Sequence, residues 1–125
     1  MKFVVKNRGE KDWMLFEVNG FLDLDKSKQM IDKSDELEEI VPGIGILIDC
    51  TKVETFDITQ DDIVLLAEHF NKISDRSGRT ALVTGPQDDR HTLGMMYEIM
   101  VKDFEGRMVK VFYNTDEALA WLLEE

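Results

Sequence analysis

A short run of apolar residues, Ile44 to Ile48, most constrains what this 125-residue chain can fold into. Pro42 and Gly43 precede the run and polar residues follow it from Asp49 onward, so its length is that of one strand. A strand without polar positions is typical of the centre of a parallel sheet, where helices cover both faces. The run therefore predicts an α/β fold with this strand inside the sheet.

Predicted helices and strands alternate after this run. Thr59 begins a helix, because Asp62 stands three positions on and apolar residues follow at helical spacing. We expect this helix to end near Ser77-Gly78. The later segments are predicted to be a strand over Thr80–Thr84, a helix over Thr92–Phe104, a strand over Met108–Tyr113 and a terminal helix from Thr115. Such alternation predicts parallel strands joined by right-handed crossovers.

The amino-terminal part of the chain predicts a hairpin. Phe3–Val5 and Trp13–Val18 have the composition of strands, and the polar stretch Asn7–Asp12 forms the turn between them. One or two short amphipathic helices follow between Asp25 and Ile40, with an interruption possible at Ser34-Asp35. The hairpin adds an antiparallel edge, so we predict a mixed sheet of about five strands with about four helices.

The net charge and the lengths of the apolar runs limit the kinds of partner that this chain can bind. The chain has 26 acidic and 15 basic residues, a net charge of −11, which argues against nucleic acid because phosphate contacts depend on Lys and Arg. The same charge argues against an anionic membrane surface. No apolar run approaches the ~20 residues of a membrane-spanning helix, so membrane insertion is not expected.

The length fits one domain over residues 1–125, because cores typically organise over about 100–150 residues. Cys50 is the only cysteine, which excludes an internal disulfide and a multi-cysteine zinc site. The first residues return to charge at Lys6 and do not have the apolar core of a signal peptide. Cytoplasm is the expected location.

Several segments together resemble one known family. They are Ile46–Asp49 leading to Phe56–Thr59, Arg79–Val83, Leu93–Glu98, and Val111-Phe112 followed by the Glu-Ala-Leu-Ala-Trp-Leu sequence of residues 117–122. In this respect the chain resembles the SpoIIAA-like branch of the STAS superfamily. The resemblance implies a fold like that of anti-sigma factor antagonists and SEC14-type lipid-binding domains, and it implies no enzyme activity.

The resemblance also singles out Thr59. Anti-sigma factor antagonists carry a phosphorylated serine in an Asp-Ser-Ser-Gly stretch, which falls here on Asp57–Gln60 and places Thr59 at the phosphoacceptor position. Ile58 and Gln60 depart from that stretch. A helix amino terminus would stabilise phosphate, whereas the neighbouring acids would repel it. The alternative is that Thr59 only caps its helix.

The predicted helix over Thr92–Phe104 carries more apolar residues than one stripe facing the sheet requires. Leu93, Met96 or Tyr97, Met100 and Phe104 are enough to face the sheet. Met95 and Ile99 then lie on a neighbouring side, and methionine is common at surfaces that accept varied apolar partners. This side is interpreted in three ways: a protein interface, a groove for a lipid-like ligand that involves Met95, Ile99 and Tyr97, or extra core.

Arg90 and His91 stand in a polar stretch after a predicted strand, at the sheet edge where open α/β folds bind ligands. The alternative interpretation is an ordinary surface loop. Four acids, Glu54, Asp57, Asp61 and Asp62, could hold Mg²⁺, but acids at a helix start are favoured by the helix dipole alone. We therefore expect no metal and no cofactor.

No nucleophile stands at a recognisable spacing from a base, so no catalytic set is predicted. The leading hypothesis is a non-catalytic regulatory module that acts through contact with a regulatory protein and forms a homodimer. The alternatives are a carrier or sensor of an apolar small ligand in a SEC14-type groove, and a phospho-switch at Thr59.

Overall fold

The computed structural model describes residues 2–8, 11–73, 76–102 and 108–124. In chain order, these residues form β1 (Lys2–Arg8), β2 (Lys11–Leu22), α1 (Leu24–Ile40), β3 (Gly45–Phe56), α2 (Gln60–Ile73), β4 (Thr80–Val83), α3 (Asp88–Lys102), β5 (Val109–Phe112) and α4 (Thr115–Leu122). The predicted α/β class, with about five strands and about four helices, is confirmed.

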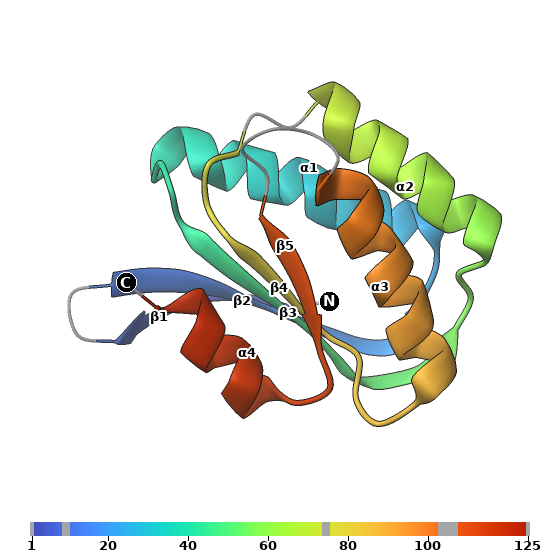
Figure 1. Ribbon diagram of the computed structural model, residues 1–125. Coiled ribbons are helices and arrows are strands. Elements are labelled where there is room, and N and C mark those ends of the chain that lie inside the picture. The colour runs from blue at the N-terminus through green and yellow to red at the C-terminus, as the bar shows by residue number, and fades with distance from the viewer. Residues whose placement is uncertain (1, 9–10, 74–75, 103–107, 125) are drawn as a thin grey trace.

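The strands form one sheet in the order β1-β2-β3-β4-β5. β1 pairs with β2 antiparallel, and every other neighbouring pair is parallel, so the predicted mixed sheet with a hairpin edge is confirmed. β3, which contains the apolar run Ile44–Ile48 from Gly45 onward, lies at the centre of the sheet. Helices α1, α2 and α3 cover one face and α4 covers the other (Figure 1).

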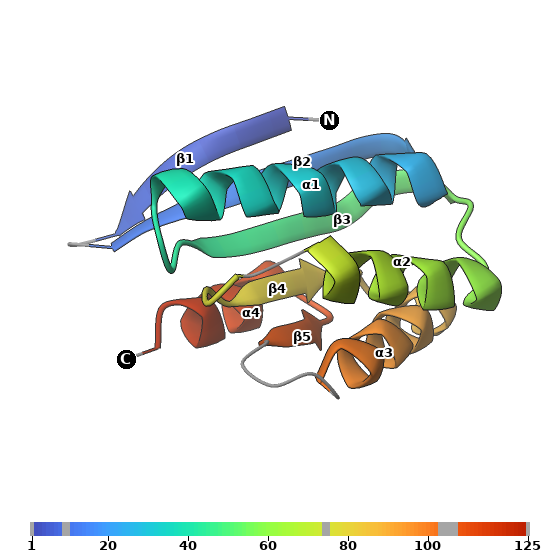
Figure 2. The ribbon, with the colours of Figure 1, turned by 90° about the horizontal axis from the view of Figure 1, so that it is seen from above.

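The two faces of β2 carry separate cores, as its alternation predicts. Met14, Phe16 and Val18 belong to the larger core beneath the three helices. Trp13 belongs to the smaller core under α4, where Leu15 packs at the margin. The view from above shows α1 alongside β2 and α3 near β5, with α2 between those two helices (Figure 2).

Two predicted boundaries are wrong, and one open alternative is decided. β3 continues beyond Ile48 to Phe56, because the polar extension pairs with the second half of β2 up to Leu22↔Phe56. Of the one or two helices predicted between Asp25 and Ile40, the structure has one, α1, in which the Ser34 hydroxyl donates to the Met30 carbonyl at 2.7 Å and so is satisfied within the helix. α3 begins at Asp88 instead of Thr92.

One further end differs from prediction. α2 ends at Ile73, before the predicted end near Ser77-Gly78. The predicted end of the next helix at Phe104 lies outside the described residues. Helices α1, α2 and α3 nevertheless lie on one face of the sheet, as the predicted crossovers require, and they position the cavity described next.

Candidate functional site

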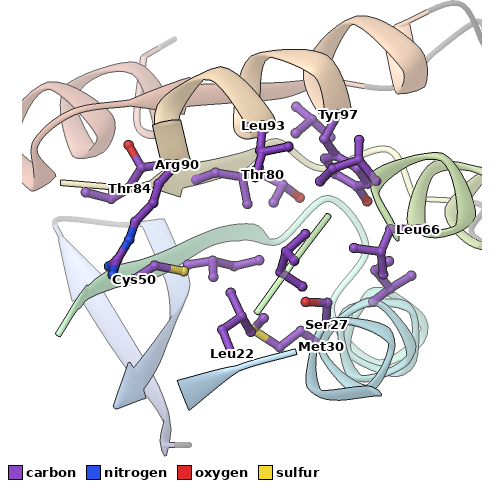
Figure 3. Close-up of a pocket in the computed structure, with 18 of the residues that line it drawn as sticks. Leu22, Ser27, Met30, Cys50, Leu66, Thr80, Thr84, Arg90, Leu93 and Tyr97 are labelled. Carbon is purple, nitrogen blue, oxygen red and sulfur yellow. The ribbon is translucent and has the colours of Figure 1, made fainter. Parts of the chain in front are cut away.

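A cavity of about 100 Å³ lies between the helix face of the sheet and helices α1, α2 and α3. Figure 3 shows side chains from the sheet and from all three helices pointing into it, among them Cys50, Met30, Leu66 and Tyr97. Its wall is almost entirely apolar. It is partly open, so a small molecule can enter it.

The arrangement of the helices explains why space remains under α2. This helix packs chiefly on its neighbours α1 and α3. A 2.8 Å contact between His69 Nε2 and Asp32 Oδ1 joins it to α1, and Phe70 meets Tyr97 of α3 edge-on at 6.3 Å between ring centroids. Ile63, Leu66 and Phe70 of α2 then form the outer wall of the cavity, opposite the strands.

Among the described residues, Arg90 is the one charged side chain that lines the cavity. Its Nη1 donates to the carbonyl of Val53 at 2.7 Å and its Nη2 to the carbonyl of Glu54 at 3.3 Å. The guanidinium also lies 5.3 Å from the ring centroid of Phe56. Arg90 therefore joins the start of α3 to the end of β3, and Figure 3 shows it reaching from α3 toward Cys50.

Cys50 forms part of the cavity wall as an uncharged thiol. Burial raises its pKa to about 12, the nearby Asp49 charge acts in the same direction, and the Arg90 charge acts against both. The side chain of Asp49 is engaged elsewhere, since its Oδ1 accepts from the amide and hydroxyl of Thr51 at 2.9 and 2.6 Å. A thiol that stays protonated is a poor nucleophile, so Cys50 contributes packing instead of reactivity.

His91 does not lie in a surface loop. It is in the first turns of α3 and is buried. A hydrogen bond of 3.1 Å joins its Nδ1 to Thr84 Oγ1, and its ring stacks on Tyr113 with centroids 3.6 Å apart. The loop interpretation is wrong because Asp88 and Asp89 begin the helix early, where acids favour a first turn, and tertiary contacts then bury the imidazole.

The predicted surface of Arg90, His91, Met95, Met96, Tyr97 and Ile99 is thus divided between different environments. Tyr97 is buried and lines the cavity, and Met96 packs at the margin of the larger core. Met95 and Ile99 point outward, with exposed fractions of 46% and 61%. The cavity wall therefore does not include the pair that the sequence placed beside Tyr97 in a groove.

Thr59 is exposed immediately before α2. Its Oγ1 accepts from the amide of Asp62 at 3.1 Å, and its own amide donates to the Asp62 carboxylate at 3.0 Å. This reciprocal pair is a capping box, which satisfies two amides at the helix start. The predicted capping role is confirmed, and phosphorylation of Thr59 stays a prediction.

In the described ranges, no three His, Cys, Asp or Glu side chains gather closely enough to hold a metal ion. Among the helices of these same ranges, none is both long enough and apolar enough to span a bilayer.

A second hollow of about 440 Å³ lies at the opposite end of the sheet, with a mixed polar and apolar wall. There Lys11 Nζ donates to the Leu123 carbonyl at 3.0 Å and Arg79 Nη1 to the Trp121 carbonyl at 2.6 Å. Both cations are thereby engaged by the carboxyl end of α4, where positive charge complements the helix dipole.

No protein-family model matches the sequence, and no curated protein matches it. Two solved structures are similar in shape. One is an uncharacterized protein of the DUF3478 family with a SpoIIAA-like fold from Shewanella loihica PV-4, with a TM-score of 0.59 and 19% identity over 97% of this chain and 92% of the other. The second is the anti-sigma factor antagonist SpoIIAA in its unphosphorylated form, with a TM-score of 0.50 and 13% identity over 96% of this chain and 95% of the other. At these identities the likeness concerns the fold, and on that ground the chain has a SpoIIAA-like fold.

Proposed function

We propose that this protein is a non-catalytic regulatory module that binds a small apolar molecule in the cavity beneath α1, α2 and α3. The SpoIIAA-like fold supports a STAS-type regulatory module. The single observation that supports a ligand is the cavity itself, which is partly open and walled almost entirely by apolar atoms.

The size of the cavity indicates the size of the ligand. A dry apolar cavity of roughly 150 Å³ is large enough to hold benzene. The cavity of about 100 Å³ has about two thirds of that volume, so it encloses about four carbons of an apolar group. Transfer of that group from water into the cavity contributes about 0.8 kcal/mol per buried methylene. Binding of the apolar group therefore transfers no charge out of water and requires no reactive group in the cavity wall.

The experiment is a titration with 1-hexanol, followed by the amide shifts of the native protein in two-dimensional NMR spectra. We expect saturable shifts for Cys50, Leu82 and Tyr97, which line the cavity. A Cys50→Phe variant fills the space and loses these shifts, whereas a Cys50→Ala variant keeps the space open and retains them. If the native protein shows no saturable shift at these residues, or if Cys50→Phe binds as well as Cys50→Ala, the apolar-ligand function is wrong.

A second candidate function is protein contact through α3. Met95 and Ile99 are four positions apart on one side of the helix and are exposed. Exposed apolar side chains of this kind favour a partner surface, in line with a homodimer or a regulatory protein. Light scattering after gel filtration tests the homodimer: we expect about twice the 14.5 kDa of one chain, and return to one chain for Ile99→Lys. A mass of one chain at high micromolar concentration contradicts the homodimer.

Thr59 offers a third point of regulation. Its hydroxyl is exposed at the start of a 14-residue helix, where a phosphate would meet the amides and the positive end of the dipole. If phosphorylation switches partner binding, Thr59→Glu and Thr59→Ala behave differently in a pulldown from lysate. Equal behaviour of the two variants leaves Thr59 as a cap alone.

A further inference from the structure

Arg90 is an unusual wall residue for an apolar cavity. It is partly buried, and among the described residues no carboxylate lies at ion-pair distance from it. Its two hydrogen bonds, to the carbonyls of Val53 and Glu54, are made to neutral acceptors. The positive charge at the edge of the cavity therefore has no ion-pair partner among the described residues.

The guanidinium also has spare donors. Arginine carries five N–H donors, of which the two carbonyls engage two. The side chain is held in place by these bonds and by Phe56, so little conformational freedom is lost when a further acceptor binds. A fixed guanidinium without an ion-pair partner among the described residues, beside an apolar space, matches a ligand with one anionic end and one apolar end.

We propose that the ligand of this cavity is a small carboxylic acid, with about four carbons of its apolar tail in the cavity and its carboxylate on Arg90. This inference rests on the proposed function, because it names the class of the same apolar ligand. The planar carboxylate fits the planar fork of the guanidinium. Its single negative charge balances the single positive charge, whereas a phosphate monoester would leave charge over at a partly buried site.

The overall charge of the protein makes this preference a specific one. At a net charge of −11, general electrostatics disfavours any anion at the surface. A carboxylic acid that binds better than the alcohol of the same length must therefore gain from a local contact. Arg90 is the charged side chain in the described cavity wall that can supply that contact.

The test compares hexanoate with 1-hexanol in NMR titrations at pH 7 and 0.15 M salt. We expect hexanoate to bind the native protein at least tenfold more tightly than 1-hexanol. Arg90→Gln should weaken hexanoate at least tenfold and change 1-hexanol by no more than twofold. Lys52→Gln is the matched control, since Lys52 is an exposed cation on β3 outside the cavity wall, and it should leave both affinities unchanged.

The outcomes separate this inference from the function on which it rests. If 1-hexanol binds as tightly as hexanoate, or if Arg90→Gln binds hexanoate like the native protein, the proposed contact between the ligand carboxylate and Arg90 is wrong. The proposal of an apolar ligand then still stands. If neither compound shifts the cavity residues, both are wrong. Should Arg90→Gln fail to fold by circular dichroism, the comparison of acid and alcohol on the native protein still decides the question.

Discussion

Gly94 lines the cavity and allows α3 to lie against β5. A Cβ at Gly94 would lie 2.7 Å from Cγ2 and 3.4 Å from Cβ of Val111. Carbon atoms in good contact are about 3.5–4.0 Å apart, so a methyl group at residue 94 is short of space by about 1 Å. Val111 is 7% exposed and cannot turn away into solvent.

The cost of Gly94→Ala is the balance of two effects. Alanine in place of glycine favours the helix by about 1 kcal/mol, and overpacking a core costs about 1–3 kcal/mol. We expect a net loss of about 1 kcal/mol in the free energy of unfolding. Val111→Ala alone should cost about 2 kcal/mol, because two buried methyl groups are lost and a void remains.

The double variant distinguishes this explanation from a general weakening of the helix. With Val111→Ala the opposing methyl groups are gone, so the Gly94→Ala substitution contributes its helix preference without the overlap. The double variant should then lose about 1 kcal/mol instead of the additive loss of about 3 kcal/mol, a coupling of about 2 kcal/mol.

Urea unfolding of the four proteins, followed by far-ultraviolet circular dichroism, measures the cycle. The m-values should agree among the variants if only stability has changed. If the two substitutions add to within about 0.5 kcal/mol, the close approach of α3 to Val111 does not limit residue 94, and the reasoning is refuted.

Three further predictions concern other parts of the fold. Gly78→Ala should lower the free energy of unfolding by about 3 kcal/mol, because a Cβ at residue 78 overlaps the Ile44 carbonyl oxygen. Gly20→Ala has open space around it and should lower the free energy of unfolding by only about 1 kcal/mol, because of its positive φ. Equal losses of the two variants in urea unfolding contradict this. Cys50 should resist Ellman's reagent at pH 8 in the folded protein and react on unfolding, since its pKa is about 12; rapid labelling of folded protein contradicts this. Glu38→Gln should remove a stabilisation that the native protein has above pH 4.5 and loses as the pH falls below it. A difference in stability between the native protein and Glu38→Gln that stays constant from about pH 7 to about pH 3 contradicts this.

The sign of the Glu38 prediction follows from its surroundings. Partial burial acts to raise its pKa, but amide donors from Gly43 and Gly78, the Ser77 hydroxyl and the Arg76 charge lower it below 4.5 overall. A carboxyl group with a lowered pKa stabilises the folded state when ionised, and that stabilisation disappears on protonation. Unfolding midpoints measured across this pH range follow the loss directly.

Strand positions were predictable because their signals are local. The alternation in Trp13–Val18 separates the two faces of β2, and the structure places these residues in two different cores as expected. The extension of β3 to Phe56 was not predictable in the same way. Its polar residues form a strand because β2 offers a partner along that length.

The wall residues of the cavity carry no special signal in the sequence. Leu66 and Phe70 follow the helical spacing of any core-facing stripe, and Cys50 resembles one more buried residue after an apolar run. His91 misled the prediction because its neighbours are polar, while the ring on which it stacks belongs to Tyr113, in a later segment of the chain. Local composition indicates that a residue is buried, but not whether packing around it is complete.

The sequence by itself determined the order of the elements, the central buried strand and the antiparallel edge, because apolar periodicity and turn residues act over a few positions. Only the tertiary structure decided that α2 rests on its neighbouring helices with space beneath it, and that Arg90 meets Val53 across 37 positions at the rim of that space. Such features depend on the distances between whole layers and on contacts between remote segments, which no short stretch of residues encodes.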